Sequence, residues 1–365
     1  MNLGILLPIG SSLTDQKKTG QDKRFIEYYL KNYNRFFEKI FIFSYGKEKF
    51  SFPSKCFLVA NKFSLNRFLY SFLLPFLNFK MIREIDVFRV MQLTGTIPAI
   101  LTKIFFQKKF VFTYGYDYVA FAKLEGQKIR PILLKLLEKI AMKVCSGAIV
   151  TTKILEKKLQ KKYPKIKLFY LPNGVDIKKF KPRSPITNHQ LPITKLLFVG
   201  RLEKQKNLKN LIEVVALLKN KNKISLLFIG QGKLKLQLLK LAKNLGVNLK
   251  ISNPVSHIKL VKYYQRADIF CLPSFLEGQP KVLLEAMACG LPCLVGNYAG
   301  VEEFQNKKEI LTTGFKANQI AYNLEKLIKN QKLKKTLSRN SRKRVEKDFD
   351  IDKLLLKEIN ILRNV

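Results

Sequence analysis

At 365 residues, of which 47% are hydrophobic, the chain has room for two α/β domains and too much apolar material to stay disordered. Its 68 Lys and Arg against 26 Asp and Glu give a net charge of +42. This charge indicates either attraction to polyanions or compositional drift, because the lysines are scattered through the whole chain.

The composition also bears on compartment. Five cysteines without a CxxC pair, beside only two histidines, argue against a zinc site or a disulfide framework. No apolar run reaches the roughly 18–20 residues of a membrane span. The opening residues MNLGILLPIG lack a basic region and reach Pro8 too early for a signal peptide, so a cytoplasmic protein is expected.

The first half of the chain alternates apolar runs with helical patterns. Residues 3–7 predict a strand, followed by a polar loop at 8–20 that contains Gly10 and by a helix at about 21–37. Strand, glycine-bearing loop and helix in this order open a Rossmann-like unit. Further strands are expected at 39–44, 57–60, 86–91, 109–113, 147–151 and 167–171, with helices at 98–106 and 129–144.

Residues 63–80, FSLNRFLYSFLLPFLNFK, are unusually rich in Phe and Leu. This composition suits an amphipathic helix lying in a lipid interface. A helix packed on the sheet is the favoured interpretation, because Pro75 interrupts the pattern. Together with the net charge, however, the segment keeps attachment to an anionic membrane surface open.

Prolines and polar residues crowd at 181–194 and predict a linker. A second alternating half follows, with strands at 195–199, 224–229, 247–251, 269–272 and 293–295. Arg201 and Lys206 follow its first strand, where two cations at one loop can bind phosphate oxygens. The overall class is therefore α/β, with one doubly wound domain on each side of the linker.

The stretch 268–297, DIFCLPSFLEGQPKVLLEAMACGLPCLVGN, holds the densest cluster of site chemistry. Pro280 suits the first turn of a helix at 280–289. Glu277 precedes that helix and Glu285 lies beyond its first turn, so the two carboxylates flank its start. The free N–H groups there favour a phosphate, and carboxylates accept hydrogen bonds from sugar hydroxyls. A nucleotide sugar combines these groups.

The segment SFLEGQPKVLLEAMACGLPCL resembles the donor-site signature of the retaining GT-B glycosyltransferases of family 4, the glycosyl transferases group 1. The resemblance implies two Rossmann-like domains facing each other across a cleft. It implies that Glu277 contacts the donor sugar, Glu285 the nucleotide ribose, and Arg201 and Lys206 the donor diphosphate. Other donor-binding positions that it indicates are Gly278, Gln279, Pro280, Lys281, Val282, Gly10, Gly230 and Val255.

Three residues are candidates on the acceptor side. Tyr114 stands in TYGYD where the family commonly has a histidine before the glycine, and a phenol is no base at neutral pH. Asp117 either caps the next helix or contacts an acceptor hydroxyl. Asn173 belongs to PNGVD, which resembles the family's turn at the end of the N-terminal domain.

The resemblance and the residues together predict a metal-independent hexosyltransferase with no cofactor besides its donor, a nucleoside diphosphate sugar. UDP is favoured over GDP, and the acceptor is expected to be a polysaccharide or a lipid-linked oligosaccharide, as in lipopolysaccharide or capsule synthesis. Residues 1–180 would form the acceptor domain and 181–347 the donor domain, with a helix at 348–365 packing back on the first. Asp348, Asp350 and Asp352 form DxD triplets, but acids that open a terminal helix complement its dipole and predict no metal.

Other functions remain possible on sequence alone. An inverting transferase would need a side-chain base, for which Asp117 is the candidate, and a nucleotide-sugar epimerase could share the fold. A basic nucleic-acid-binding protein is a further alternative, although the sequence shows no nucleic-acid-binding motif. The expected location is the cytoplasm, with peripheral attachment to the inner face of the cytoplasmic membrane as an option.

Overall fold

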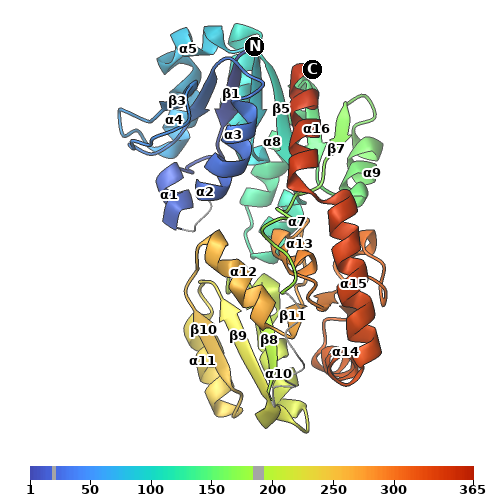
Figure 1. Cartoon of the computed structure of the whole chain (residues 1–365). Helices are drawn as coiled ribbons and strands as arrows, with labels where there is room; N and C mark the ends of the chain where they lie inside the picture. The colour runs from blue at the N-terminus through green and yellow to red at the C-terminus, as the bar shows by residue number, and fades with distance from the viewer. Residues whose placement is uncertain (19–21, 184–192) are drawn as a thin grey trace. The chain divides into compact units, whose positions relative to one another are not determined.

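The computed structural model describes residues 1–18, 22–183 and 193–365 (Figure 1). The chain divides into two compact units. Unit 1 comprises Met1–Pro172 and Asp352–Val365, and unit 2 comprises Asn173–Ile351. Most of the linker expected at 181–194 lies outside the described residues, as do the end of the loop expected at 8–20 and the start of the helix expected at 21.

Unit 1 is built on a seven-stranded parallel sheet with the order β3-β2-β1-β4-β5-β6-β7. Its strands are almost continuous apolar runs because both faces of the sheet are covered. The order reverses between β1 and β4. The strands are β1 (Leu3–Leu6), β2 (Ile40–Phe43), β3 (Cys56–Val59), β4 (Val87–Val90), β5 (Lys109–Tyr114), β6 (Gly147–Val150) and β7 (Leu168–Tyr170).

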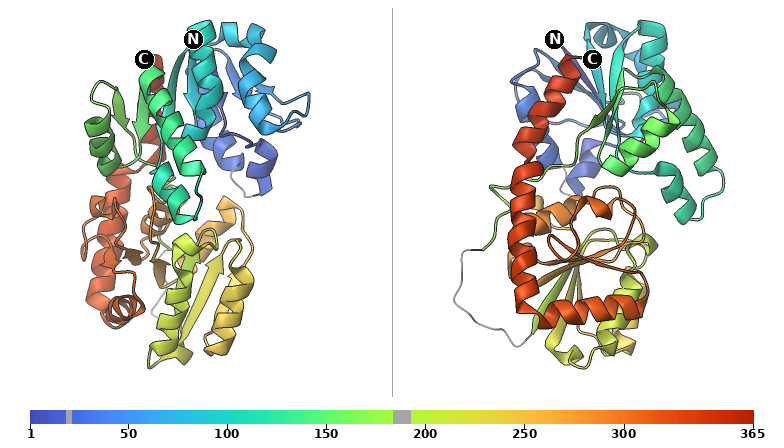
Figure 2. Two further views of the ribbon diagram at one scale, coloured as in Figure 1. Left: turned by 180° about the vertical axis from the view of Figure 1, so that it is seen from behind. Right: turned by 90° about the vertical axis from the view of Figure 1, so that its right-hand side faces the viewer.

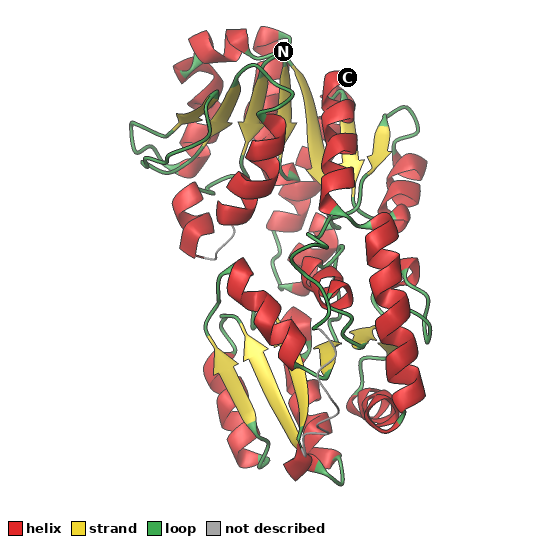
Figure 3. Ribbon diagram, viewed as in Figure 1, coloured by secondary structure: helices red, strands yellow, loops and turns green. Residues whose placement is uncertain are grey.

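Helices cover both faces of this sheet (Figure 3). One layer, with its own apolar core, consists of α4 (Arg67–Leu77), α5 (Phe79–Glu84), η2 (Leu93–Gly95), α6 (Thr96–Phe106), α7 (Tyr118–Leu124), α8 (Arg130–Val144) and α9 (Lys153–Lys162). The opposite layer consists of α1 (Leu13–Lys18), α2 (Asp22–Arg24), the π-helix η1 (Phe25–Leu30), α3 (Lys31–Tyr33) and the C-terminal α16 (Ile351–Arg363).

Helix α16 is fixed to the sheet of unit 1 by apolar contacts and by a buried ion pair. Leu354, Ile359 and Leu362 belong to the same core as β1 and β2. The Arg89 guanidinium of β4 donates to the Glu358 carboxylate, and both side chains are buried. A buried charge is tolerated in this way only when it is paired, so the pair fixes the position of α16.

The expectation that Pro75 interrupts the 63–80 pattern is wrong. Pro75 lies inside α4, which continues to Leu77. A proline removes one intrahelical hydrogen bond, and here the burial of Tyr70, Leu74 and Pro75 against the sheet offsets that loss. The helix therefore carries its apolar pattern along its whole length.

Unit 2 contains a six-stranded parallel sheet with the order β10-β9-β8-β11-β12-β13. Its strands are β8 (Thr194–Val199), β9 (Ile224–Ile229), β10 (Leu249–Ser252), β11 (Ile269–Leu272), β12 (Cys293–Gly296) and β13 (Leu311–Thr313). Its helices are η3 (Lys204–Lys206), α10 (Leu208–Leu217), η4 (Lys221–Lys223), α11 (Lys235–Asn244), α12 (His257–Arg266), α13 (Lys281–Ala288), η5 (Val301–Glu303), α14 (Ala317–Lys329) and α15 (Gln331–Asp348). Residues 317–348 form two helices, because Asn330 ends α14 and caps α15 by accepting from Leu333 N (2.8 Å).

The predicted fold class, α/β with two doubly wound sheets, is confirmed. In each sheet the strand order reverses once, between β1 and β4 in unit 1 and between β8 and β11 in unit 2. Ligands of such folds bind beyond the carboxyl ends of the strands at the reversal. Within the described ranges, helices long and apolar enough to cross a membrane are absent.

Candidate functional site

The loops after β8 and β11 lie side by side at the reversal of the unit 2 sheet. Phe275 N donates to Gln205 O (2.9 Å), and the Gln205 side-chain amide donates to Leu276 O. These bonds join the 201–206 loop to the loop that carries Glu277. Two segments about 70 residues apart in the sequence are thereby fixed as one surface.

Lys206 and Glu277 form an ion pair across these two loops. The distance between Lys206 Nζ and Glu277 Oε1 is 2.6 Å, and the side chains are only 11% and 8% exposed. Burying either charge alone would be costly, so each side chain keeps the other in place. The sequence prediction placed both residues at the site, but it did not anticipate that they bond to each other.

A buried hydroxyl adjoins this pair. Tyr298 OH is buried without a hydrogen-bond partner among the described residues. Burial, followed by the nearby carboxylates of Glu277 and Glu303, raises the pKa of Tyr298 well above its usual range. The phenol therefore stays neutral as a potential donor. Sequence reasoning missed it because a lone tyrosine after a strand has no distinguishing spacing.

Arg201 follows Gly200 at the end of β8 and is exposed. The loop after β9 packs on this segment backbone to backbone: Leu202 N donates to Gln231 O (2.9 Å). A Cβ on Gly230, whose φ is +152°, would lie 1.9 Å from Gly200 O, and one on Gly232 would lie 2.4 Å from Leu202 O. These glycines are required for the close approach that positions Arg201.

Helix α13 begins one residue later than predicted, at Lys281, with Pro280 as its N-cap residue. The Pro280 side chain makes no capping hydrogen bond. The first turn of α13, at Lys281 and Val282, follows Glu277 and Gly278 in the chain. A helix start carries partial positive charge and suits an anion.

Gln279 and Asn173 hold the loop before α13. Gln279 is buried; its side-chain oxygen accepts from Asn173 N, and its carbonyl accepts from Asn173 Nδ2 (2.7 Å). Gln279 Nε2 also donates to Glu303 Oε2 (3.3 Å). The structure thus places Asn173, a candidate for the acceptor side, in unit 2 against the predicted donor loop.

Glu285 faces α12 from inside α13 and is only 3% exposed. Its Oε1 lies 3.0 Å from His257 Nε2, and its Oε2 accepts from Tyr264 OH (3.0 Å). Burial and the carboxylate beside it raise the pKa of Tyr264. Sequence reasoning missed both partners, although His257 follows the candidate Val255 by two residues and is one of only two histidines.

In unit 1, Gly10 lies in the loop after β1, at the reversal of that sheet. Its φ is +72°, and a Cβ there would lie 2.6 Å from the Arg67 side chain. The loop after β4 is equally close, since a Cβ on Gly95 would lie 2.9 Å from Leu7 O. Both glycines are explained by backbone conformation and close packing, whatever ligand they face.

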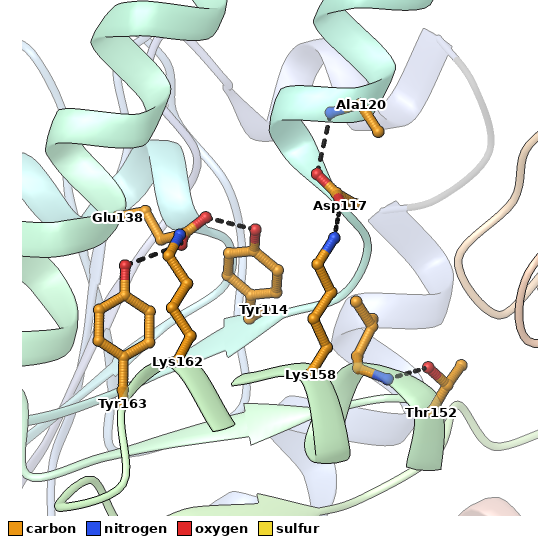
Figure 4. A network of polar contacts seen from close by, with 9 residues as sticks. Tyr114, Asp117, Ala120, Glu138, Thr152, Lys158, Lys162 and Tyr163 are labelled. Carbon is orange, nitrogen blue, oxygen red and sulfur yellow. Dashed lines mark hydrogen bonds and ion pairs between the residues drawn. The ribbon is translucent and has the colours of Figure 1, made fainter. Parts of the chain in front are cut away.

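Tyr114 and Asp117 line a cavity of about 470 Å³ among α7, α8 and α9 (Figure 4). Tyr114 OH donates to Glu138 Oε2 (2.6 Å), and the same buried carboxylate accepts from Tyr163 OH (2.9 Å) and Lys162. Burial and then Glu138 raise the pKa of Tyr114 far above its usual range. The phenol therefore acts as a donor to Glu138, a residue that sequence analysis did not select.

Asp117 is the N-cap of α7. It accepts from Ala120 N (2.9 Å) and from Lys158 Nζ (2.5 Å). Of the two roles considered for this residue, the structure shows the capping role, and contact with an acceptor stays a prediction. In the C-terminal segment, Asp348 pairs with Arg344 (2.6 Å), and Asp352 lies in the first turn of α16.

The fold has clear counterparts among known proteins. The structure matches sucrose-phosphate synthase from Thermosynechococcus elongatus with a TM-score of 0.83 over 100% of this chain and 98% of that one, at 17% identity. The shared architecture of two doubly wound units is the GT-B fold.

The sequence profile described as Glycosyl transferases group 1 matches residues 183–344, which lie within unit 2. The chain is 29% identical to the capsular polysaccharide biosynthesis glycosyltransferase CapM of Staphylococcus aureus, over 74% of this chain and 73% of CapM. It is 30% identical to the UDP-Gal:alpha-D-GlcNAc-diphosphoundecaprenol alpha-1,3-galactosyltransferase of Escherichia coli, over 52% of each protein. The chain is therefore a glycosyltransferase, and its residues 183–344 are similar to the glycosyl transferases group 1 family.

Proposed function

We propose that the chain transfers a hexose-type sugar from a nucleoside diphosphate sugar, with UDP favoured over GDP, to a hydroxyl of a polysaccharide or lipid-linked oligosaccharide. The configuration at the transferred carbon is retained and no metal takes part. The observation that carries the proposal is the buried Lys206–Glu277 pair in the loops that precede α13. The names of the two relatives support the donor and the acceptor class.

Three groups would hold the donor diphosphate: Arg201, Lys206 and the first N–H groups of α13. Negative charge grows on the diphosphate as the sugar leaves. Cations and dipoles that are already in position stabilise that charge without reorganisation, which is usually the largest electrostatic contribution to catalysis. Lys206 is the best placed of the three because Glu277 fixes it from the side, and Glu277 can still accept a hydrogen bond from a sugar hydroxyl.

Glu285 would bind the ribose, with Val255 and Gly230 beside the nucleotide. His257 and Tyr264 hold the carboxylate in one rotamer. A ribose hydroxyl that donates to Glu285 would therefore meet an acceptor that is already oriented. Such preorganisation lowers the entropic cost of binding.

Retention would follow from attack on the face that the leaving group occupies. The bond between the anomeric carbon and the phosphate oxygen breaks as the acceptor oxygen bonds to the same carbon. The proton of the acceptor hydroxyl passes to the departing phosphate oxygen, so no side-chain base is needed. Tyr114 and Asp117 in unit 1 would contribute to the acceptor side by positioning, since both are engaged in hydrogen bonds.

The enzyme would work in the cytoplasm, attached peripherally to the inner face of the cytoplasmic membrane. Two observations support this location: the diphosphoundecaprenol-linked acceptor in the name of the Escherichia coli relative, and the net charge of +42. A lipid-linked acceptor is confined to a membrane, and a basic protein is attracted to anionic lipid.

Thermal unfolding without divalent metal tests the donor site. The protein is heated with UDP, GDP, ADP and their sugars, alongside Arg201→Ala and Lys209→Ala, an exposed lysine on α10 as the matched control. One nucleotide at about 100 times its Kd should stabilise the wild type and the control by about 2.7 kcal/mol, and Arg201→Ala much less. The assignment of the donor site would be refuted if no nucleotide shifted the unfolding temperature, or if all nucleotides shifted it alike. It would also be refuted if Arg201→Ala showed the same shift as the wild type. The anomeric configuration of the product, determined by NMR, separates retention from inversion.

A further inference from the structure

Helices α4, α6 and α8 form one outer layer of unit 1, with α6 packed between the other two. They lie next to one another, facing the viewer, in the left panel of Figure 2. Their inner sides contribute Tyr70, Leu74, Ala99, Leu134 and Ala141 to the core. Their outer sides, called here the α4–α6–α8 face, are apolar as well.

On α4 the outer side carries Phe68, Phe72 and Phe76 at intervals of four residues, and each ring is about half exposed. The stripe continues to α5 at Phe79. Residues four apart lie above one another on a helix, so these rings form one row. A helix that is apolar on both its inner and outer sides lacks the polar stripe with which helices usually meet water.

The row of α4 is continuous with α6. Phe105, at the end of α6, is 61% exposed, and its ring centroid lies 5.1 Å from that of Phe76 in an edge-to-face contact. On α8, Ile129, Leu133, Leu136 and Ile140 form a second exposed row at helical spacing. Contiguous apolar surface on this scale marks an interaction site.

Cations border the apolar rows. The Arg67 guanidinium lies over the Phe68 ring (5.1 Å) and that of Arg83 over the Phe79 ring (5.7 Å). On α8, Lys135, Lys139 and Lys143 are exposed, whereas the only acid of that helix, Glu138, points inward to Tyr114. The face is thus apolar along its rows and positive around them.

We propose that the α4–α6–α8 face docks on a bilayer that contains anionic lipid. Its Phe, Ile and Leu side chains would enter the boundary between headgroups and acyl chains, and its Lys and Arg side chains would reach the lipid phosphates. A second copy of this chain fits the face poorly, because it would bring the same cations against it. The proposal deepens the proposed function, on which it rests for the membrane as partner, by naming the surface that binds.

Flotation of the full-length protein with vesicles tests the proposal. Vesicles of phosphatidylcholine alone are compared with vesicles of phosphatidylcholine and phosphatidylglycerol. One variant replaces Phe72, Phe105, Leu133 and Leu136 by Ser. The matched control makes the same change at four exposed apolar residues of other surfaces, Leu217, Leu236, Ile258 and Leu356. A charge variant replaces Lys135 and Lys139 by Glu.

The wild type and the matched control should float with the anionic vesicles, and far less with phosphatidylcholine alone. The four-residue variant of the face should bind at least about tenfold more weakly, because it loses four of the nine exposed apolar side chains of the rows. The charge variant should bind the anionic vesicles at least about fivefold more weakly for each lysine replaced. Unchanged flotation of the face variant would overturn the proposal. So would concentration-dependent dimerisation without lipid that the face variant abolishes, because the face would then bind a second copy.

The nucleotide-dependent thermal shift is measured on the same variants. All of them change side chains outside the donor loops of unit 2, so each should keep the nucleotide shift of the wild type. Loss of lipid binding with an intact nucleotide shift supports the docking face. Lipid binding without a nucleotide shift in any protein would contradict the proposed function and leave the docking face in place. The docking proposal and the proposed function can therefore be refuted independently of each other.

Discussion

The two sheets reverse at equivalent points, but the loops at those points differ in kind. In unit 2 the loops after β8 and β11 bring Arg201, Lys206 and Glu277 to the reversal, and two of these charges are buried against each other. In unit 1 the loop after β4 approaches the end of β1 through Gly95, where a Cβ would lie 2.9 Å from Leu7 O, and Gly10 in the loop after β1 packs against Arg67. Charged loops at the point of reversal suit a ligand that carries its own charge, such as a diphosphate. Loops that are lined by backbone suit a neutral or extended ligand.

The buried carboxylates of the two units show a related contrast. Glu138 in unit 1 accepts from Tyr114, Tyr163 and Lys162, so its neighbours alone supply its hydrogen bonds. Glu277 in unit 2 accepts from one lysine, in the loop before α13. A fully bonded carboxylate serves structure, while one with remaining lone pairs can serve a ligand.

The largest effect is expected from Lys206→Met. It leaves the buried Glu277 charge unpaired, which should lower the free energy of unfolding by about 3 kcal/mol, and it removes the cation at the diphosphate, which should lower transfer by about 10²–10³-fold. Urea unfolding and the initial rate of sugar transfer measure the two effects. Adding Glu277→Gln should restore much of the stability and none of the transfer. Recovery of both would show that Lys206 acts only through folding.

Glu285→Ala should have the next largest effect. It removes the partner of His257 Nε2 and leaves Tyr264 OH only its longer bond to Val282 O (3.3 Å). This should cost about 1–3 kcal/mol of unfolding free energy, and the variant should raise the Kd for the nucleotide. Tyr264→Phe is the reference, because it disturbs the same cluster without removing the carboxylate. If both variants weaken nucleotide binding equally, Glu285 does not contact the ribose. Isothermal calorimetry and urea unfolding give the two quantities.

Tyr114→Phe tests the contrast from the side of unit 1. The loss of one buried hydrogen bond to Glu138 should cost about 1 kcal/mol of unfolding free energy, with the nucleotide-dependent thermal shift unchanged. Tyr163→Phe removes a longer bond to the same carboxylate from a more exposed position, so its cost should be smaller. If the nucleotide-dependent thermal shift is smaller in Tyr114→Phe than in the wild type, this network supports the donor site as well.

The alternation of strands and helices was predictable because apolar runs and helical periods are local patterns. Residues that follow a strand at a fixed distance, such as Arg201 and Lys206, could be assigned to loops on the same ground. The partners inside the sites could not be predicted. The Lys206–Glu277 pair and the bonds of Glu285 to His257 and Tyr264 join segments far apart in the sequence, and they form only when the sheet brings those segments together.

The course of α4 could not be predicted from the sequence for another reason. Proline at position 75 weakens a helix locally, and only the burial of its neighbours against the sheet shows that the helix persists. The same tertiary context decides which apolar side chains remain outside. The composition of residues 63–80 suggested lipid, but the exposed row from Phe68 to Phe79 and its continuation on α6 and α8 became visible only in the structure.

The smallest effect is expected from Asp117→Asn. Burial alone would raise the pKa of Asp117, but the hydrogen bonds from Lys158 and Ala120 N lower it below its ordinary value of 3.8. A carboxyl whose pKa is lowered in the folded state stabilises the fold above its ordinary pKa and loses that contribution as the pH falls through the folded value. Asparagine still caps α7 but loses the pair with Lys158. The variant should therefore be less stable by under about 1 kcal/mol near neutral pH. The difference should shrink as the pH falls below the ordinary value of 3.8 and vanish only below the lowered folded pKa.

The same variant decides between retention and inversion at this residue. If transfer proceeds with the leaving phosphate as base, Asp117→Asn should change the rate only a few-fold. A side-chain base contributes about 10²–10⁴-fold, so a loss of that size, with stability nearly intact, would make Asp117 the base of an inverting reaction. In that case NMR should also show that the configuration at the anomeric carbon of the product is inverted. The rate and the anomer together leave only one of the two mechanisms standing.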